Sequence, residues 1–512
     1  MPGEEIKIGP FVGGLNTFSD PTSIEDTELT ELVNFELDLD GSLVSRPPIV
    51  DTGVNMTLDT TGNMKLLGWY VTSGGAPYLI GSDGLTKTYY FDGTSWTLIT
   101  DTFAASAMTQ FRDKAWLVAP IGESDPGGTW DPSSGFSAEA NMPRGSVIIS
   151  NKERLWLGLG ADTTANGTRL YLTDLVSGVP TWSSPASYVD IGPGDGQKIV
   201  DLAVYYSDLI VFKQGSTYRF AFDTDPSVGT ISRVSANIGA TDARCNASYE
   251  NRLYVLFDNK VYEFTNYTFD RLNDKVPLEA SNPSVTLAEY NNISIWADRL
   301  FVTFYDTTFV YSLKTRTWTT WQSDVLSNIG RVLPIPGQQG VQPVAYTYST
   351  VPRTSDLYKI SDFITADSEE MTCILKTKNY DYLTPNKFKR LFWWGVDVLC
   401  KTAINAEVTP ITYVTSVTWN DVKNSGLTID QLAATGTWDR PLDVTYAVSE
   451  LVSTSSVIGD RKYVKFMKSL RFRLVNFKLS ISTDGSSAEA PVRVFRLLTG
   501  VRDKQLVSDR IS

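Results

Sequence analysis

From about residue 63, the apolar and polar positions follow a repeating unit: a short apolar strand, a polar turn and an aromatic-rich strand. Each of seven such units can be anchored on one apolar residue, and the anchors are Tyr78, Ala115, Leu155, Leu209, Leu253, Leu300 and Ala345. Their spacings are 37, 40, 54, 44, 47 and 45 residues, and propeller blades repeat about every 40–50 residues. The pattern therefore predicts an all-β chain with a β-propeller of about seven blades over residues 63–368. A β-sandwich, which also has strands at short regular spacing, is the alternative.

Charged clusters precede several of the anchors. They are Arg112-Asp113-Lys114, Asn151-Lys152-Glu153-Arg154, Glu250-Asn251-Arg252 and Ala297-Asp298-Arg299. A hairpin turn at such a cluster would expose its charges and direct the residues that follow into the core. We therefore expect hairpins at these points.

The first 62 residues lack the repeat and predict an extended N-terminal arm that docks onto another surface. Its best helical window is Ser23–Phe35, where Ile24, Leu29, Leu32 and Val33 follow a loose amphipathic pattern. Ser23 at the start of this window could cap a short helix.

After about residue 369 the repeat ends, and basic and apolar residues alternate instead. This alternation occurs in Lys387–Phe392, Lys462–Lys468, Arg471–Val475 and Pro491–Arg496. A period of about two gives a strand one buried face and one exposed face. Residues 369–512 are therefore predicted to form an antiparallel β-sandwich with a basic outer surface.

Composition narrows the chemistry that the chain can perform. Histidine is absent, which excludes Ser-His-Asp and Cys-His catalysis and metal sites that need imidazole. The three cysteines, Cys245, Cys373 and Cys400, are far apart and odd in number, so we expect small buried side chains rather than a disulfide framework or a zinc site. Catalysis by carboxylates alone, as in glycoside hydrolases, is still open.

The net charge of −13 is unevenly distributed. Residues 371–512 hold 20 Lys and Arg against 13 Asp and Glu, whereas the rest of the chain is strongly acidic. Such polarity suits subunits that stack or bind unlike partners, and it does not indicate specific nucleic-acid binding. No apolar run is long enough to span a membrane, and Met1–Glu5 lacks the features of a secretory signal, so synthesis in a cytoplasm is expected.

Three short motifs resemble ligand sites but lack a defining part. Phe11–Thr17 is rich in glycine without the spacing of a phosphate loop. Asp38, Asp40 and Ser42 have the spacing that begins a calcium loop, but Ile49 stands where its bidentate Glu belongs. Asp190–Gly196 could hold a cation, although Gly-Pro-Gly is first a turn signal.

Paired carboxylates for glycoside hydrolysis would have to come from different blades that meet near the ring axis. Asp201 and Asp242 are candidates of this kind, and nothing in the sequence marks them as a pair. We expect no enzymatic activity and no cofactor or metal.

The N-terminal segment contains several short pieces in a characteristic order: Gly13–Thr17, Asp20-Pro21, Leu32–Phe35, Asp40–Leu43 and Arg46–Pro48. Together they resemble the opening of tail proteins of tailed bacteriophages, in which such a stretch precedes a β-propeller. Nozzle proteins of short-tailed phages begin in this way, and minor tail proteins of phages that infect actinobacteria are more similar in sequence over Glu36–Pro48. The resemblance covers residues 1–350.

The resemblance implies a structural subunit of the virion tail, at its tip or nozzle, made in the host cytoplasm. Its partners would be other tail proteins in a multi-copy assembly, with a contribution to host attachment or DNA passage. The residues expected to dock a neighbouring subunit are Gly13, Gly14, Leu15, Asn16, Asp20, Pro21, Asn34, Arg46 and Pro47. The alternatives are a propeller that binds a host-surface carbohydrate and a glycan hydrolase.

Overall fold

The computed structural model describes residues 4–58, 62–159, 167–279, 291–304, 307–323, 326, 329–336, 344–349, 355–361, 371–380, 389–399, 404–411, 450–452, 462–472, 474–482 and 492–503. The chain divides into two units. The propeller unit comprises Pro47–Leu313 and Trp321–Glu369, and the sandwich unit comprises Met1–Arg46, Lys314–Thr320 and Glu370–Ser512. Regular structure in the described residues is β-strand throughout, apart from one 3-10 turn, η1 (Pro226–Val228).

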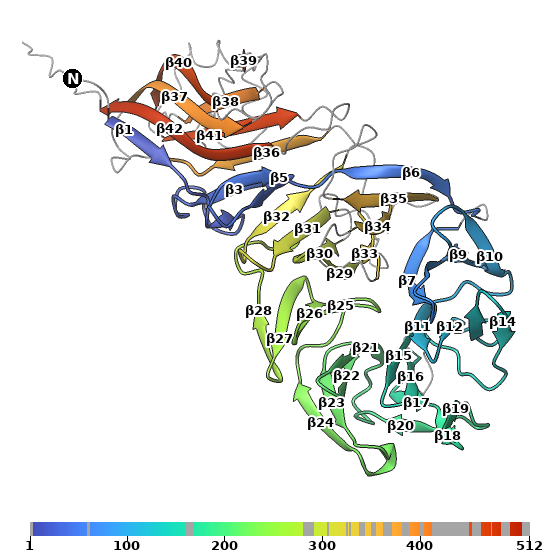
Figure 1. The fold of residues 1–512 in the computed structure, drawn as a ribbon. Coiled ribbons are helices and arrows are strands. Elements are labelled where there is room, and N and C mark those ends of the chain that lie inside the picture. The colour runs from blue at the N-terminus through green and yellow to red at the C-terminus, as the bar shows by residue number, and fades with distance from the viewer. Residues whose placement is uncertain are drawn as a thin grey trace, which may run out of the picture. The chain divides into compact units, whose positions relative to one another are not determined.

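Six separate four-stranded antiparallel sheets form blades of the propeller, and four consecutive strands of a larger sheet form one further blade (Figure 1). The first blade consists of β7 (Lys65–Val71), β8 (Pro77–Ser82), β9 (Thr88–Phe91) and β10 (Trp96–Thr100). The second consists of β11 (Ala107–Phe111), β12 (Lys114–Val118), β13 (Gly128–Asp131) and β14 (Gly135–Ala138). The third consists of β15 (Val147–Asn151), β16 (Arg154–Gly158), β17 (Arg169–Leu172) and β20 (Tyr188–Asp190). A separate hairpin, β18 (Asp174–Val176) and β19 (Val179–Thr181), is inserted before β20.

The next three blades follow in chain order. The fourth consists of β21 (Ile199–Tyr205), β22 (Asp208–Lys213), β23 (Thr217–Ala221) and β24 (Thr230–Ser235). The fifth consists of β25 (Asn246–Tyr249), β26 (Arg252–Phe257), β27 (Lys260–Thr265) and β28 (Thr268–Arg271). The sixth consists of β29 (Asn292–Trp296), β30 (Arg299–Phe304), β31 (Thr307–Ser312) and β32 (Trp318–Trp321).

The seventh blade joins the two ends of the propeller unit. Its strands β33 (Leu333–Pro334), β34 (Val344–Tyr348) and β35 (Asp356–Ser361) are completed by β6 (Ile49–Asn55) from the start of the unit. Ile49 is fully buried in the core of this blade, and the Thr52 hydroxyl donates a hydrogen bond to the Leu357 carbonyl at 2.6 Å. Residues 49–55, which we assigned to the N-terminal arm, thus close the ring.

The first strand of every blade lies at the ring axis. Each first strand contacts that of the next blade, and β33 contacts β7, so the inner strands form an unbroken circle. In Figure 1 the labels β7, β11, β15, β21, β25 and β29 surround one common centre. The predicted propeller is confirmed, and all seven anchor residues lie on the second strand of a blade.

The charged clusters form the expected hairpin turns. Arg112 and Asp113, Lys152 and Glu153, and Ala297 and Asp298 are pairs in which both residues have φ between 49° and 61°. Two consecutive positive φ angles define the type I′ turn, which matches the twist of the flanking strands. These turns carry residues for which that conformation is unfavourable.

Glu153→Gly is therefore expected to stabilise the propeller unit by about 0.5–1 kcal/mol, because glycine adopts a φ of 61° without steric cost. The ion pair that Glu153 forms with Arg112 is exposed and contributes little. Urea unfolding would measure the gain. Ser73→Gly, at an exposed loop residue without a positive φ, should give no gain, and an equal gain there would contradict the explanation.

Apolar side chains from neighbouring blades interlock to form the core. Between the third and fourth blades, the Trp156 and Phe220 rings meet edge to face, with centroids 5.6 Å apart. Comparable clusters lie between the first and second, the second and third, the sixth and seventh, and the seventh and first blades. The blades in these clusters are thus covered by their neighbours, as the ring requires.

The sandwich unit is built from two sheets. One has the order β4 (Phe35–Leu37), β5 (Leu43–Ser45), β42 (Arg493–Asp503), β37 (Lys389–Leu399) and β40 (Lys462–Phe472), with β1 (Glu4–Ile8) also paired to β42. The other contains β3 (Glu28–Val33), β36 (Thr372–Thr377), β41 (Leu474–Ser482), β38 (Ile404–Ile411) and β39 (Glu450–Val452), with β2 (Gly14–Leu15) paired in parallel to β3.

The two sheets pack face to face, as predicted for a C-terminal β-sandwich. Trp394 on β37 lies against Phe477 on β41, with ring centroids 5.2 Å apart. Within 492–498, Val494 and Leu497 are fully buried, whereas Arg493 and Arg496 reach acidic partners, Asp38 and Asp397. The side chains of Lys387–Phe392 and Lys462–Lys468 lie outside the described residues, so the predicted basic face stays a prediction.

The N-terminal segment is extended but contains no helix, so the short helix expected over Ser23–Phe35 is a wrong prediction. The residues form turns followed by β3 and β4, and Asn34 between these strands has a φ of 57°. The helical pattern was weak, and pairing of β3 with β36 satisfies its backbone while Leu29, Leu32 and Val33 become buried. Tertiary pairing thus overrides a marginal local preference.

Candidate functional site

The two glycines of the N-terminal motif allow β2 to approach its neighbours closely. Gly14 has a φ of +64°, and a Cβ atom there would lie 2.7 Å from the Thr317 Cβ. A Cβ on Gly13 would lie 2.5 Å from the Glu28 Cγ. The Gly-Gly pair is therefore a packing requirement of the sandwich unit and does not form a phosphate loop.

Gly14→Ala is expected to destabilise the sandwich unit by about 2–3 kcal/mol, because it combines an unfavourable φ with a steric clash. Gly53→Ala is the matched control, since Gly53 has a φ of +67° and a Cβ there would meet no atom within 4 Å. It should cost its own unit only the 1–2 kcal/mol or so of the backbone conformation. Chemical unfolding of both variants would compare the two losses, and equal losses would exclude the clash.

Asn16 and Leu15 are also buried. The Asn16 side-chain amide donates to the Glu28 carboxylate at 3.0 Å, and its Oδ1 accepts from the backbone N–H groups of Phe18 and Ser19. This side chain therefore fixes the loop that follows β2.

Asn34 and Arg46 form a second buried connection. The Arg46 side chain is 1% exposed, and its Nε donates to Asn34 Oδ1 at 2.8 Å. Asn34 Nδ2 donates to the Thr372 carbonyl at 2.9 Å. These two residues therefore tie the N-terminal segment to β36, and they are not open to a partner protein.

The exposed residues of the motif lie on both sides of β2 and at Asp40. Asp20 and Pro21 are exposed, as are Val12 and Phe18, with fractional exposures of 51% and 71%. Hydrogen bonds from the Thr22 hydroxyl and backbone N–H lower the pKa of Asp20. Pro47, by contrast, is buried. A docking role for the exposed residues stays a prediction.

The remaining acidic motifs are occupied by contacts within the protein. Asp40 Oδ1 accepts from the Ser42 N–H and hydroxyl, which forms the turn favoured over a calcium loop. No cluster of three or more metal-ligating side chains occurs among the described residues. Cys245 and Cys373 are buried free thiols, as expected, while Cys400 lies outside the described residues.

The Asp190–Gly196 loop does hold a cation, and the cation is the protein's own. The Lys213 side chain is completely buried, and its Nζ donates to the carbonyls of Ile191 and Gly192 at 2.9 and 3.2 Å. It also forms a 2.6 Å ion pair with Asp195. The ammonium group therefore takes the place that the sequence left open for an external ion.

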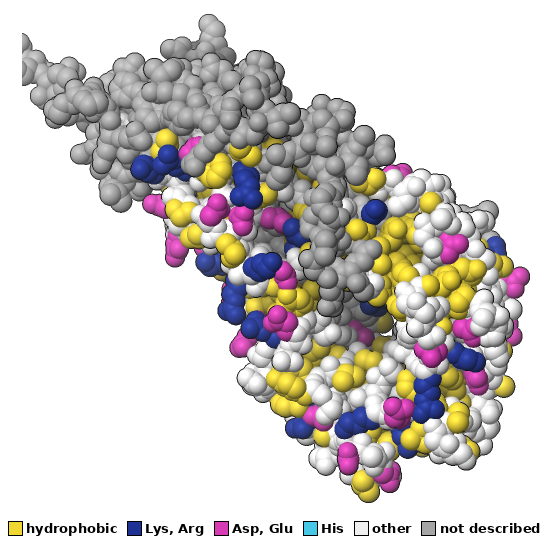
Figure 2. Space-filling model, viewed as in Figure 1, with side chains coloured by type: hydrophobic (Ala, Val, Ile, Leu, Met, Phe, Trp, Pro, Cys, Tyr) yellow, Lys and Arg dark blue, Asp and Glu magenta, His cyan; other side chains and the backbone are white. Residues whose placement is uncertain are grey.

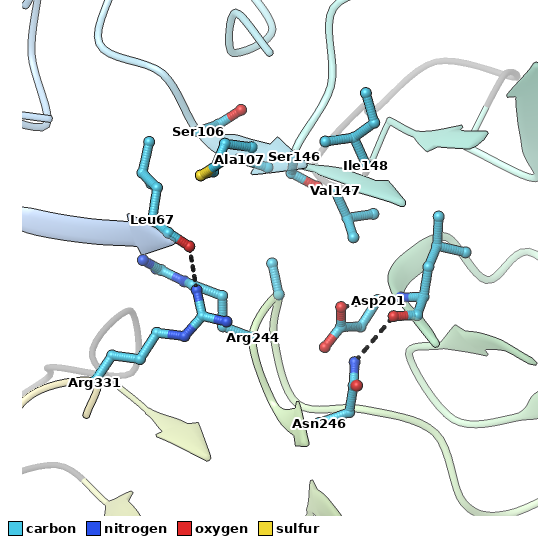
Figure 3. A pocket seen from close by; sticks show the side chains of 13 residues that line it. Leu67, Ser106, Ala107, Ser146, Val147, Ile148, Asp201, Arg244, Asn246 and Arg331 are labelled. Carbon is cyan, nitrogen blue, oxygen red and sulfur yellow. Dashed lines mark hydrogen bonds between the residues drawn. The ribbon is translucent and has the colours of Figure 1, made fainter. Parts of the chain in front are cut away.

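A pocket of about 140 Å³ lies at the ring axis, where the inner strands meet (Figure 3). Its wall comes from six blades, because Leu67, Met108, Ile148 and Asp201 lie on β7, β11, β15 and β21. Other lining residues stand just before β25 and β33: Arg244 and Arg331. Figure 2 shows the surface hollowed at the centre of the ring.

The pocket places a carboxyl group opposite two guanidinium groups. In Figure 3, Asp201 and Asn246 face Arg244 and Arg331 across the cavity. Burial raises the pKa of the Asp201 carboxyl to about 7, against the lowering effects of the Leu202 N–H, Asn246 and Arg331. Burial first, and the neighbouring Arg244 cation second, lower the pKa of Arg331 to about 10.

Asp201 gives stability a defined pH dependence. Its pKa is higher in the folded protein than the ordinary value of 3.8, so between about pH 4 and pH 7 the folded state holds a proton that the unfolded state has lost. The free energy of unfolding should therefore fall as the pH rises through this range, by up to about 1.4 kcal/mol per pH unit. Asp201→Asn removes this contribution to the slope.

Urea unfolding of the wild type and the variant at pH 5 and pH 8 measures that difference. Asp92→Asn is the control, because hydrogen bonds from Thr94 and Ser95 lower the pKa of Asp92 and place its titration below this range. A wild-type pH dependence unchanged by Asp201→Asn would show that Asp201 is ionised at pH 5.

The sequence named Asp201 and Asp242 but missed both arginines of the pocket. Asp242 raises the pKa of Asp201 by its charge, so the two carboxylates do lie within electrostatic reach. Arg244 and Arg331 stand alone in the sequence, without a motif, and only the ring brings them together.

No protein-family model matches the chain, and no curated protein matches it. Among solved structures, it is similar to the extracellular domain of a putative one-component system of B. thetaiotaomicron, with 11% identity and a TM-score of 0.40 over 67% of this chain and 40% of that one. PorZ, a surface component of the type-IX secretion system of Porphyromonas gingivalis, matches with 11% identity and a TM-score of 0.39 over 65% and 43%. YCF48 from Cyanidioschyzon merolae matches with 11% identity and a TM-score of 0.40 over 60% and 98%.

The chain thus spans about two fifths of the length of the first two of these structures. Likenesses at this level carry no inference about function, and the propeller assignment rests on the sheets themselves. No helix in the described part of the chain is long and apolar enough to cross a membrane.

Proposed function

We propose that this chain is a structural subunit of a bacteriophage tail, located at the tail tip or nozzle and not an enzyme. The observation that carries the proposal is that residues of the N-terminal motif have structural roles in the sandwich unit. Gly14, Asn16, Asn34 and Arg46 are buried or closely packed positions of the sandwich unit. The resemblance of these residues to the opening of phage tail proteins therefore reflects a shared architecture, because each residue is required by close packing or by a hydrogen bond.

Two further features agree with an assembly role. The chain has no histidine, which removes the most common catalytic base. Acidic and basic side chains are interspersed over the face of the propeller shown in Figure 2, without the basic stripe of a nucleic-acid groove. DNA passage through a nozzle would require no tight contact.

A nonsense mutation in the gene of the parent phage tests this function. The proposal expects defective particles whose tails lack the tip or nozzle, seen by electron microscopy, with normal particles restored by the gene supplied in trans. Complete, infectious particles made without the protein would overturn the proposal.

A second candidate is carbohydrate binding at a groove between the second and third blades. This groove has a volume of about 430 Å³ and is lined by residues that include Tyr171, Asn141 and Arg144, and an aromatic ring with nearby polar groups suits a sugar. A glycan array with the wild type and Tyr171→Ala would test it. Binding that the substitution abolishes would support a receptor role, and no binding by the wild type would remove it.

The axial pocket, at about 140 Å³, is smaller than typical ligand sites of about 300 Å³ or more, which disfavours a glycan hydrolase there.

A further inference from the structure

We propose that the pocket on the propeller axis binds one small oxyanion, such as inorganic phosphate or sulfate, between the guanidinium groups of Arg244 and Arg331. This site is independent of the proposed tail function. It rests on the convergence of the two arginines, on their unfilled hydrogen-bonding capacity and on the size of the cavity.

The first step is the convergence of two cations in a partly open cavity. Arg244 and Arg331 come from segments before β25 and β33, and both line the same cavity of about 140 Å³. Each is only partly exposed. Two like charges in a region of low dielectric repel strongly, and a bound anion relieves the repulsion.

The second step is the lack of protein partners. Arg331 donates one hydrogen bond, to the Leu67 carbonyl at 2.6 Å, and the described residues provide no other. The Arg244 side chain has no hydrogen bond or ion pair within the described part of the chain, and the Nε atoms of both arginines are buried without a partner there. Guanidinium groups match the oxygens of an oxyanion in a forked geometry.

Asp201 does not neutralise the arginines. It forms no ion pair with either arginine in the described structure, and its Oδ2 is buried without a hydrogen-bond partner there. With a pKa of about 7 it is largely protonated below neutral pH, and a protonated carboxyl can donate to an oxyanion. The Ser146 hydroxyl, also buried without a described partner, can donate as well.

The cavity selects the ligand by size. A space of about 140 Å³ holds one tetrahedral oxyanion with a few waters, whereas nucleotides and oligosaccharides need pockets of about 300 Å³ or more. The volume of the cavity therefore matches a free ion.

Isothermal titration calorimetry of the full-length protein at pH 6 tests the proposal. Sodium phosphate and sodium sulfate are titrated separately, at constant ionic strength in chloride. We expect saturable binding of one ion per chain. Arg244→Met and Arg331→Met should each weaken it by about tenfold or more. Arg112→Met is the control, since Arg112 is an exposed arginine of the same unit and its loss should leave binding unchanged.

A folding check and a further variant keep the test decisive. If a methionine variant fails to fold, as judged by circular dichroism, the same titration on Arg244→Lys, which keeps the charge but loses the fork, should still show weakened binding. The groups whose charges act on Asp201 are Arg331 and Asp242, and Arg244 lies across the pocket. Absence of saturable binding by the wild type, or binding equal in the wild type and both arginine variants, would overturn the proposal.

Discussion

Lys213→Met should lower the free energy of unfolding of the propeller unit by about 3–5 kcal/mol, because it removes one partner of a buried ion pair. The Lys213 side chain is 0% exposed, and its ammonium group lies 2.6 Å from Asp195 Oδ1. Methionine fills the volume of the lysine stem but leaves the carbonyls of Ile191 and Gly192 without the lysine donor. Asp195 loses its ion pair and keeps the hydrogen bonds from the Gln197 N–H and the Tyr218 hydroxyl. Urea unfolding followed by tryptophan fluorescence would measure the loss.

Lys260→Met is the matched control. Lys260 forms an ion pair with Asp258 at 3.2 Å in the same unit, but the two side chains are 37% and 70% exposed. An exposed pair of this kind contributes about 0–1 kcal/mol. Comparable losses in the two variants would show that the Asp190–Gly196 loop does not depend on the lysine.

Ile49→Asp should destabilise the propeller unit by about 4 kcal/mol or more, because it places an unpaired carboxylate in the strand that closes the ring. Ile49 is 0% exposed and pairs through its backbone with Ile360 of β35. The substitution removes a large apolar side chain from the core and buries a charge without a partner. Thermal unfolding should therefore begin at a much lower temperature and with less cooperativity.

The neighbouring residue provides the control for this substitution. Val50 follows on the same strand, but its side chain points to the opposite, partly exposed face, where its backbone partner is Lys359. Val50→Asp should therefore cost about 1 kcal/mol or less. If both aspartates had the same small effect, β6 would not be required for closure.

The blades were predictable because each repeats the same local chemistry. A charged I′ turn followed by an apolar strand recurs at residues such as Lys152-Glu153 and Ala297-Asp298, and the anchors fall on equivalent strands. The strand that closes the ring was not predictable in this way, because β6 is separated in sequence from the blade it completes. Its pattern of alternating buried and exposed residues is complete only beside β35.

The internal sites depend on contacts that only the fold creates. The sequence of Asp190–Gly196 indicates first a turn and only second a cation site, and nothing near it indicates that Lys213, some twenty residues away, fills it. Arg244 and Arg331 are likewise isolated in the chain and meet only at the axis. The Asn34–Arg46 pair was singled out by resemblance, and its buried hydrogen bond gives the physical reason for both residue types.

Labelling of purified virions with antibody and gold, imaged in negative stain, tests whether this chain is a component of a phage tail. We predict label at the tail tip or nozzle, at one location on each particle, and the protein in the mass spectrum of the same particles. Virions that carry neither label nor peptides of this chain would show that it is not a tail component.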